Sequence, residues 1–265
     1  MYDFTYHRAD SVTHAAGLIA NREAKLLAGG MSLLPSLKLR LARYSDLVDL
    51  KSIRGLRGVT RDGGTLTIGA LTQHAVVAAS DVVRQAIPAL AVLAGGIGDP
   101  LVRNRGTIGG SIANADPAAD YPSSLLGLGA TVITQEREIP GDNFFKGLFE
   151  TALTPGEIIT AVRFPIPERA GYVKLPHPAS RFAMVGVFVA KTADGVRVAV
   201  TGAGASAFHF RDAERALGAD FSPAALNKIA IDYAGLNSDI HASAEYRAHA
   251  IGVLTKRAVA AAIAA

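Results

Sequence analysis

The stretch Arg103–Asp120, RNRGTIGGSIANADPAAD, contains three glycines and two aspartates. Its only large aliphatic residues, Ile108 and Ile112, are the ones suited to packing in a core. Glycine has no side chain, so another group can come close to the main chain there. The composition therefore indicates a backbone surface that a ligand approaches, centred on Thr107–Ser111.

A second stretch, Ala28–Ser32, repeats this chemistry near the N-terminus, because it also joins a Gly-Gly pair to a hydroxyl residue. Backbone N–H groups at such a bend can surround a phosphate, and the positive end of a following helix favours the anion. A single Gly-Gly pair is better explained as a tight turn that needs a positive φ. Two loops of matching chemistry indicate a pyrophosphate held from both sides.

Composition excludes several other functions. The chain has 265 residues, 49% hydrophobic and 19% charged, which is typical of a globular protein. Its net charge of +4 comes from scattered cations and does not indicate nucleic-acid binding. Cysteine is absent, which excludes disulfides, a cysteinyl flavin link and a cysteine-ligated iron–sulfur cluster in this chain. The histidines lack the spacing of a zinc site, so no metal is expected.

No signal peptide and no membrane-spanning run is visible in the sequence, so we expect a cytoplasmic protein without an integral membrane segment.

Periodicity predicts an α+β fold. The predicted strands are 25–28, 47–50, 59–61, 65–68, 130–135, 157–164, 172–175, 183–191 and 196–201. The predicted helices are 11–21, 33–44, 72–79, 81–94, 117–128, 210–217, 223–234 and 242–262. Ser32 is expected to cap the second of these helices. Two X-Pro pairs in 164–167 indicate a domain boundary.

One competing motif is Gly202-x-Gly204-x-x-Ala207, which follows a predicted strand as a dinucleotide-binding fingerprint does. A Rossmann unit needs a second parallel strand that ends in an acidic residue about 20 positions later. A helical stretch follows Asp220 instead, so we expect no Rossmann unit.

Two segments, LLAGGMSLLPSLKLRL (26–41) and GDPLVRNRGTIGGSIANADPAADYP (98–122), resemble the FAD-binding medium subunit of molybdenum hydroxylases, of the aerobic carbon monoxide dehydrogenase type. The resemblance extends over essentially the whole chain. It implies a two-subdomain PCMH-type FAD-binding domain followed by a C-terminal antiparallel sheet-and-helix domain. The expected parts are 1–54, 55–166 and 167–265.

The resemblance also implies which residues hold FAD. The two glycine loops would enclose the pyrophosphate, and Asp120 would hydrogen-bond the cofactor on its ribityl chain. Lys174 would place a cation near the flavin ring, where it favours the anionic reduced form. The other reading of Lys174 is an exposed strand residue. The complete expected set is Ala28, Gly29, Gly30, Met31, Ser32, Leu33, Leu34, Ile97, Gly98, Thr107, Ile108, Gly109, Gly110, Ser111, Asp120, Ile159, Lys174 and Phe182.

Some neighbouring residues leave alternatives open. Asn114 and Asp116 are expected to cap a helix. Arg103 and Arg105 either balance phosphate charge or anchor their own loop. Arg181 stands where the carbon monoxide enzyme is expected to have an aspartate, which argues against carbon monoxide as the substrate.

Family resemblance implies an electron-transfer role. A large molybdopterin subunit oxidises substrate, and a small subunit with two [2Fe–2S] clusters delivers the electrons to FAD in this chain, which passes them to an external acceptor. The expected assembly is a dimer of heterotrimers. The alternatives are an autonomous flavoenzyme of the vanillyl-alcohol-oxidase-like superfamily and a structural adaptor that has lost flavin.

Overall fold

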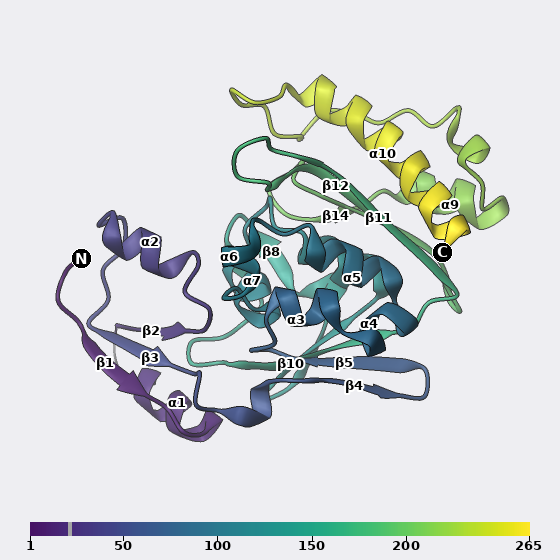
Figure 1. Ribbon diagram of the computed structural model, residues 1–265. Helices are drawn as coiled ribbons and strands as arrows, with labels where there is room; N and C mark the ends of the chain where they lie inside the picture. Colours follow the sequence, from purple (N-terminus) through teal and green to yellow (C-terminus); the bar gives the residue numbers. More distant parts are fainter. Residues whose placement is uncertain (21–22) are drawn as a thin grey trace.

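The computed structural model describes residues 1–20 and 23–265. Three sheets follow one another along the chain: a parallel sheet of order β1-β3-β2, an antiparallel sheet β4-β5-β10-β6-β7 and an antiparallel sheet β11-β12-β13-β14. Figure 1 shows the first sheet at one side of the molecule and the third beside the C-terminal helix. The α+β class is confirmed.

The first sheet is flanked by two short helices. Its elements are β1 (Thr5–Arg8), α1 (Val12–Ile19), β2 (Ala24–Leu27), α2 (Leu33–Lys38) and β3 (Asp46–Asp49). Ser11 caps α1 by accepting a hydrogen bond from the His14 N–H at 3.1 Å. The predicted helix 33–44 is wrong in length, because Arg40 has a left-handed φ of 59° that a helix cannot continue through. The expected end of the first helix, Asn21, lies outside the described residues.

The second sheet and its helices form the middle of the chain. Its strands are β4 (Val59–Asp62), β5 (Thr65–Gly69), β6 (Thr131–Thr134), β7 (Glu138–Pro140) and β10 (Ile159–Pro165). A separate hairpin joins β8 (Phe145–Gly147) to β9 (Glu150–Thr151). The helices are α3 (His74–Ala79), α4 (Asp81–Ala86), α5 (Pro88–Gly95), α6 (Pro100–Arg103), α7 (Ile108–Asn114) and α8 (Tyr121–Leu128).

Two helix predictions in this region need correction. The expected helix 81–94 is two helices, because Pro88 cannot continue the hydrogen-bond ladder and starts α5 at its first position. The expected helix 117–128 begins only at Tyr121, and α7 precedes it. Asp116 accepts a hydrogen bond from the Ala118 N–H at 2.9 Å and so stabilises the turn between α7 and α8.

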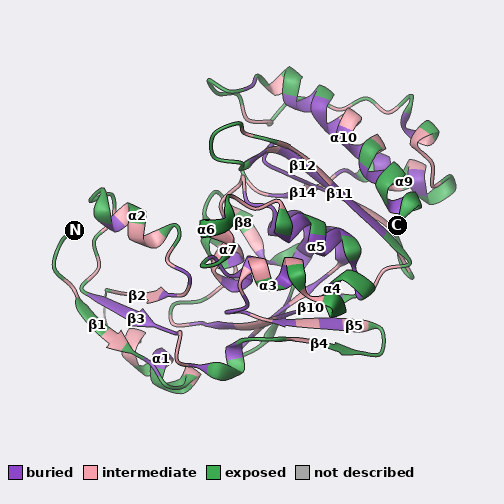
Figure 2. Ribbon diagram, in the orientation of Figure 1, coloured by how far each residue is buried: buried purple, intermediate pink, exposed green. Residues whose placement is uncertain are grey.

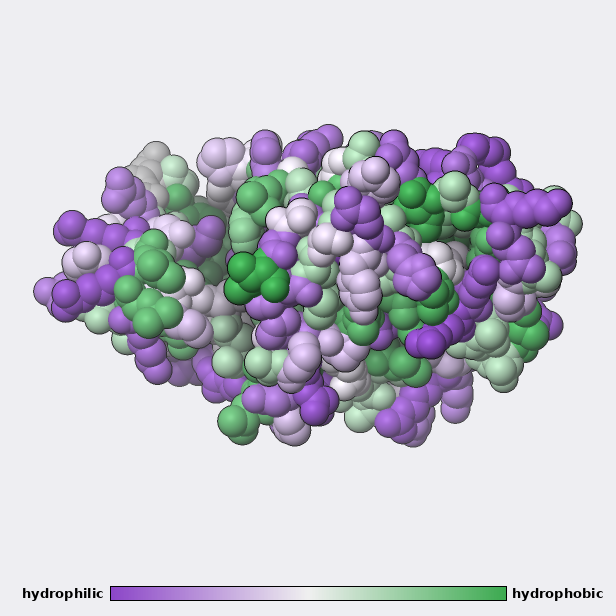
Figure 3. Space-filling view, turned by 90° about the horizontal axis from the view of Figure 1, so that it is seen from above, coloured by the Kyte–Doolittle hydropathy of each residue, from purple (hydrophilic) through white to green (hydrophobic). Residues whose placement is uncertain are grey.

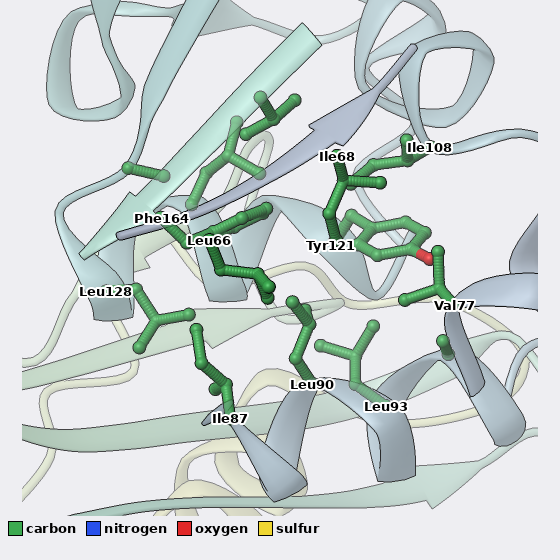
Figure 4. Close-up of a cluster of buried hydrophobic side chains, with 14 of the residues drawn as sticks. Leu66, Ile68, Val77, Ile87, Leu90, Leu93, Ile108, Tyr121, Leu128 and Phe164 are labelled. Atoms are coloured by element: carbon green, nitrogen blue, oxygen red, sulfur yellow. The ribbon is translucent and has the colours of Figure 1, made fainter. Parts of the chain in front are cut away.

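The largest hydrophobic core lies between this sheet and α3–α5. Figure 4 shows Leu66, Ile68 and Phe164 of the sheet facing Leu90 and Leu93 of α5. All five side chains are fully buried. Figure 2 shows that α5 and the strands of the third sheet also carry many buried residues, drawn in purple.

The third sheet carries the remaining helices. Its strands are β11 (Arg169–Pro176), β12 (Ala183–Thr192), β13 (Gly195–Thr201) and β14 (Phe208–His209), and its helices are α9 (Arg211–Ala219) and α10 (Ala244–Ala264). Helices α5 and α8 pack against this sheet, as does α10, which Figure 1 shows covering its outer side. The middle and C-terminal parts are thereby joined through α5 and α8.

The predicted helix 223–234 is wrong, because only a 3₁₀ turn, Pro223–Leu226, forms there. The Asp232 carboxylate accepts from the Ala234 N–H at 2.9 Å, a local bond that competes with a helix. The glycines of the fingerprint-like motif follow β13, which pairs antiparallel with β12 and β14, so the structure contains no Rossmann unit there. The described residues include no helix long and apolar enough to span a bilayer.

The surface in Figure 3 is mostly hydrophilic, with hydrophobic side chains interspersed among polar ones. Two exposed apolar residues lie just after α2: Leu39 is 70% and Leu41 is 77% exposed.

A test of this packing uses Gly171 on β11. A Cβ there would lie 2.1 Å from the Ala258 carbonyl oxygen of α10, so Gly171→Ala must displace the helix. We expect a loss of about 1–3 kcal/mol in the free energy of unfolding, measured by denaturant titration. Gly218→Ala in α9 is the control, because a Cβ there meets nothing within 4 Å. Equal stability of the two variants would contradict the observed contact.

Candidate FAD site

The first glycine loop has free main-chain donors. Gly29, Gly30, Met31 and Ser32 lie between β2 and α2, and none of their N–H groups has an acceptor among the described residues. Gly30 has a φ of +78°, which favours glycine. Successive unpaired N–H groups of this kind make an anion-binding concavity. The loop can therefore accept a phosphate oxygen.

Ser32 occupies the N-cap position of α2, but its side chain makes no capping hydrogen bond. The predicted N-cap position is therefore correct, but the expected side-chain cap does not form. Because α2 has only six residues, we attribute the capacity of this loop to accept an anion to its local N–H groups.

The second glycine loop, Thr107–Ser111, is the N-terminal turn of α7: Thr107 is the N-cap and the helix begins at Ile108, so the expected loop conformation is wrong. Its N–H groups donate within the chain. The Ile108 N–H donates to the Thr72 carbonyl at 3.1 Å, and the Gly109 N–H donates to the Ala70 carbonyl at 2.8 Å. The Gly110 N–H donates to Thr107 Oγ1 at 3.2 Å. The Ser111 N–H donates to the Thr107 carbonyl at 2.9 Å. These bonds fix the loop rigidly, so what it offers a ligand is a bare, closely approachable surface.

The two loops lie side by side although they come from different sheets. A Cβ on Gly29 would be 2.1 Å from the Arg105 carbonyl oxygen and 2.8 Å from Gly106 Cα. A Cβ on Gly110 would be 3.6 Å from Ala28 Cβ. A side chain at residue 29 would therefore overlap the backbone of the facing segment, which explains why glycine stands there. At Gly110 the contact across the junction is an ordinary van der Waals distance, and the close neighbour is Thr107 Oγ1 at 2.9 Å.

Asp120 and Lys174 form a buried ion pair. Asp120 precedes α8, and its Oδ1 accepts from Lys174 Nζ at 2.8 Å and from the Tyr172 hydroxyl at 2.6 Å. The Asp120 side chain is 3% exposed and that of Lys174 is 10% exposed. Burial raises the pKa of Asp120, while the Lys174 charge and the Tyr172 hydrogen bond oppose that rise. The reading of Lys174 as an exposed strand residue is therefore wrong.

The loop after α5 lies beside this pair. Lys174 Nζ also donates to the Arg181 carbonyl at 2.8 Å, and a Cβ on Gly96 would lie 3.7 Å from Lys174 Cε. Arg103 Nη1 donates to the carbonyls of Ile97 at 3.0 Å and Gly98 at 2.9 Å. In this structure Arg103 is therefore an anchor of its loop.

The other expected contacts differ in exposure. Phe182 is 45% exposed on the β11–β12 loop, while Ile159 is 6% exposed and packs within the main core. Met31 is 37% exposed, and Leu33 and Leu34 are half-buried. Their contact with FAD remains a prediction from the resemblance.

Sequence reasoning missed Tyr172. Tyr172 and Lys174 are two residues apart on β11, so they share a face of the sheet. This alternation was a usable signal, but the partner aspartate lies 52 residues earlier and only the fold brings the three groups together.

Comparison with known proteins identifies the class of this chain. Residues 2–167 match the FAD binding domain in molybdopterin dehydrogenase, and residues 172–262 match the CO dehydrogenase flavoprotein C-terminal domain. These matches define an FAD-binding flavoprotein subunit.

Individual relatives cover nearly the whole chain. It is 36% identical to the 6-hydroxypseudooxynicotine dehydrogenase complex subunit alpha of Paenarthrobacter nicotinovorans, covering 98% of this chain and 94% of the relative. It is 35% identical to the carbon monoxide dehydrogenase medium chain of Hydrogenophaga pseudoflava, covering 98% and 96%. The solved structure of reconstituted CO dehydrogenase from Oligotropha carboxidovorans matches with a TM-score of 0.92 and 32% identity, covering 99% and 98%.

The chain belongs to the family of FAD-binding medium subunits of molybdenum hydroxylases. It binds FAD and is an oxidoreductase subunit.

Removing Lys174 tests the buried pair. Lys174→Met leaves the Asp120 carboxylate without its compensating cation, so we expect a loss of about 3–5 kcal/mol in the free energy of unfolding. Tyr172→Phe removes one hydrogen bond and keeps the ion pair, so it should lose only about 1 kcal/mol. Denaturant titration compares them, and a Lys174→Met protein as stable as Tyr172→Phe would contradict the pair.

Proposed function

We propose that this chain is the electron-transfer subunit of a molybdenum hydroxylase complex. It would take electrons from the [2Fe–2S] clusters of a small subunit through FAD to an external acceptor. A large molybdopterin subunit would oxidise the substrate, and the assembly would be a dimer of heterotrimers. Bound FAD supplies the redox chemistry, because it can exchange one or two electrons.

The observation that carries the proposal is the junction of the two glycine loops. Four free N–H groups of Gly29–Ser32 can hold a diphosphate oxygen, and the rigid Thr107–Ser111 loop lies beside them. Asp120, between α7 and α8, and its partner Lys174 would provide polar groups for the ribityl and flavin portion. This chain therefore contributes binding and electrostatics.

Two features support an electron carrier over an autonomous flavoenzyme. The sequence contains no cysteine, so this chain cannot link flavin through sulfur or hold a cysteine-ligated cluster of its own. The two family matches, over residues 2–167 and 172–262, are to an FAD binding domain in molybdopterin dehydrogenase and to a CO dehydrogenase flavoprotein C-terminal domain. The intact loop glycines argue against an adaptor without flavin. A cytoplasmic location remains a prediction.

Co-purification tests the proposal. A tagged chain expressed with the adjacent reading frames should retain two further polypeptides, one with iron–sulfur and one with molybdenum, in equal amounts by native mass spectrometry. Rapid mixing with the complex's substrate should then bleach the flavin band near 450 nm, a wavelength given by the cofactor's general properties. A chain that turns over a substrate alone would support the autonomous flavoenzyme instead.

A substitution at Gly110 tests the diphosphate site. In Gly110→Val the side chain would occupy the space next to Thr107 Oγ1, at 2.9 Å, and Ala28 Cβ, at 3.6 Å. We expect the purified protein to lose its FAD while its circular dichroism stays unchanged. Gly64→Val, in an open hairpin turn where a Cβ meets nothing within 4 Å, should keep FAD. Stoichiometric FAD in the Gly110→Val protein would refute the assignment.

A further inference from the structure

The start of α3 is hydrogen-bonded to the segment Asn104–Gly106, which packs against the first glycine loop. The His74 N–H donates to the Gly106 carbonyl at 3.0 Å, and Gln73 Nε2 donates to the Asn104 carbonyl. Gln73 and Thr107 also form an antiparallel bridge. The segment that precedes the second glycine loop is thereby fastened to α3.

Gly106 links the His74 ring to Gly29. A Cβ on Gly106 would lie 2.5 Å from His74 Nε2, so the imidazole packs directly against this glycine. A Cβ on Gly29 would lie 2.8 Å from Gly106 Cα. The imidazole therefore supports the backbone at Gly106 by packing against it. Gly106 in turn packs against Gly29 and limits its position.

Two buried polar atoms near this contact have no partner within the described part of the chain. They are His74 Nδ1 and the Tyr121 hydroxyl, on residues that are 4% and 0% exposed. The two ring centroids are 5.4 Å apart at an angle of 45°. Figure 4 shows the Tyr121 hydroxyl directed toward Val77, about one turn after His74 on α3. Unpaired buried polar groups are costly, and a bound water usually satisfies them.

Burial keeps the His74 ring neutral. Desolvation, together with the nearby Arg103 charge, lowers the pKa of His74 to about 4. A neutral imidazole has one donor and one acceptor nitrogen, so Nδ1 can bond a water in either tautomer. A water between Nδ1 and the tyrosine hydroxyl would satisfy both groups without introducing charge.

We propose that one buried water joins His74 Nδ1 to the Tyr121 hydroxyl, and that His74 is thereby a positioning residue for the FAD diphosphate loop. The link fixes the imidazole, the imidazole supports Gly106, and Gly106 supports Gly29 beside the free N–H groups. The effect of this link on FAD binding rests on the proposed diphosphate site, whereas the presence of the water does not. Because Tyr121 follows Asp120, the same link connects the diphosphate loop with the start of α8.

The test combines FAD release with nitrogen NMR. Tyr121→Phe keeps the ring and removes only the oxygen, and His74→Leu removes the imidazole. We expect each to speed FAD release by about tenfold, the effect of roughly one hydrogen bond. Because both act through one water, the double variant should release FAD no faster than His74→Leu alone. In ¹⁵N-histidine-labelled protein, Tyr121→Phe should shift the His74 Nδ1 resonance.

Each arm can overturn the proposal. Unchanged release in both variants would refute the positioning role, and multiplied effects in the double variant would refute a shared water. An unshifted His74 resonance in Tyr121→Phe would refute the link whether or not FAD binds, whereas failure of the unmodified chain to bind FAD would refute only the diphosphate site. His209→Gln is the control; His209 bonds Glu214 at 2.7 Å in the C-terminal part and should leave FAD release unchanged.

Discussion

The contact of Gly29 with Arg105 and Gly106 is the constraint on which the rest of the site depends. A hypothetical Cβ at Gly29 would lie 2.1 Å from a carbonyl oxygen, so no other residue allows this approach without movement of the backbone. This contact joins the loop that follows strand β2 of the first sheet to the Arg105–Gly106 segment, which is hydrogen-bonded to the start of helix α3. This close contact positions the N–H groups of Gly29–Ser32 beside the second glycine loop.

The second glycine loop contributes a rigid surface to the site, because its N–H groups already have acceptors within the chain. Because the N–H groups of Ile108–Ser111 donate within the chain, the loop cannot rearrange cheaply when a ligand arrives. The second glycine loop is thus rigid, and the first supplies the N–H donors. This division of roles is compatible with an extended cofactor, since a preformed surface reduces the entropy lost on binding.

The sequence predicted the class, most strands and the first glycine loop, because these depend on short-range patterns. The second glycine stretch is the start of helix α7. Sequence-based prediction failed where long-range contacts decide. The predicted helix 33–44 ends at Lys38, shortly before Arg40, whose left-handed φ no periodicity indicates. The pairing of Asp120 with Lys174 required two segments that the sheets bring together. The internal use of the second loop's donors depends on carbonyls at Ala70 and Thr72, which lie far earlier in the chain.

The buried pair also explains why the C-terminal part is integral to the flavoprotein. Asp120 is held at the start of α8, and α8 packs against β12 and β13, while Lys174 comes from β11 of the same sheet. A buried carboxylate without its lysine would tend to take up a proton, because desolvation disfavours its charge. The third sheet therefore controls the charge beside the expected flavin position.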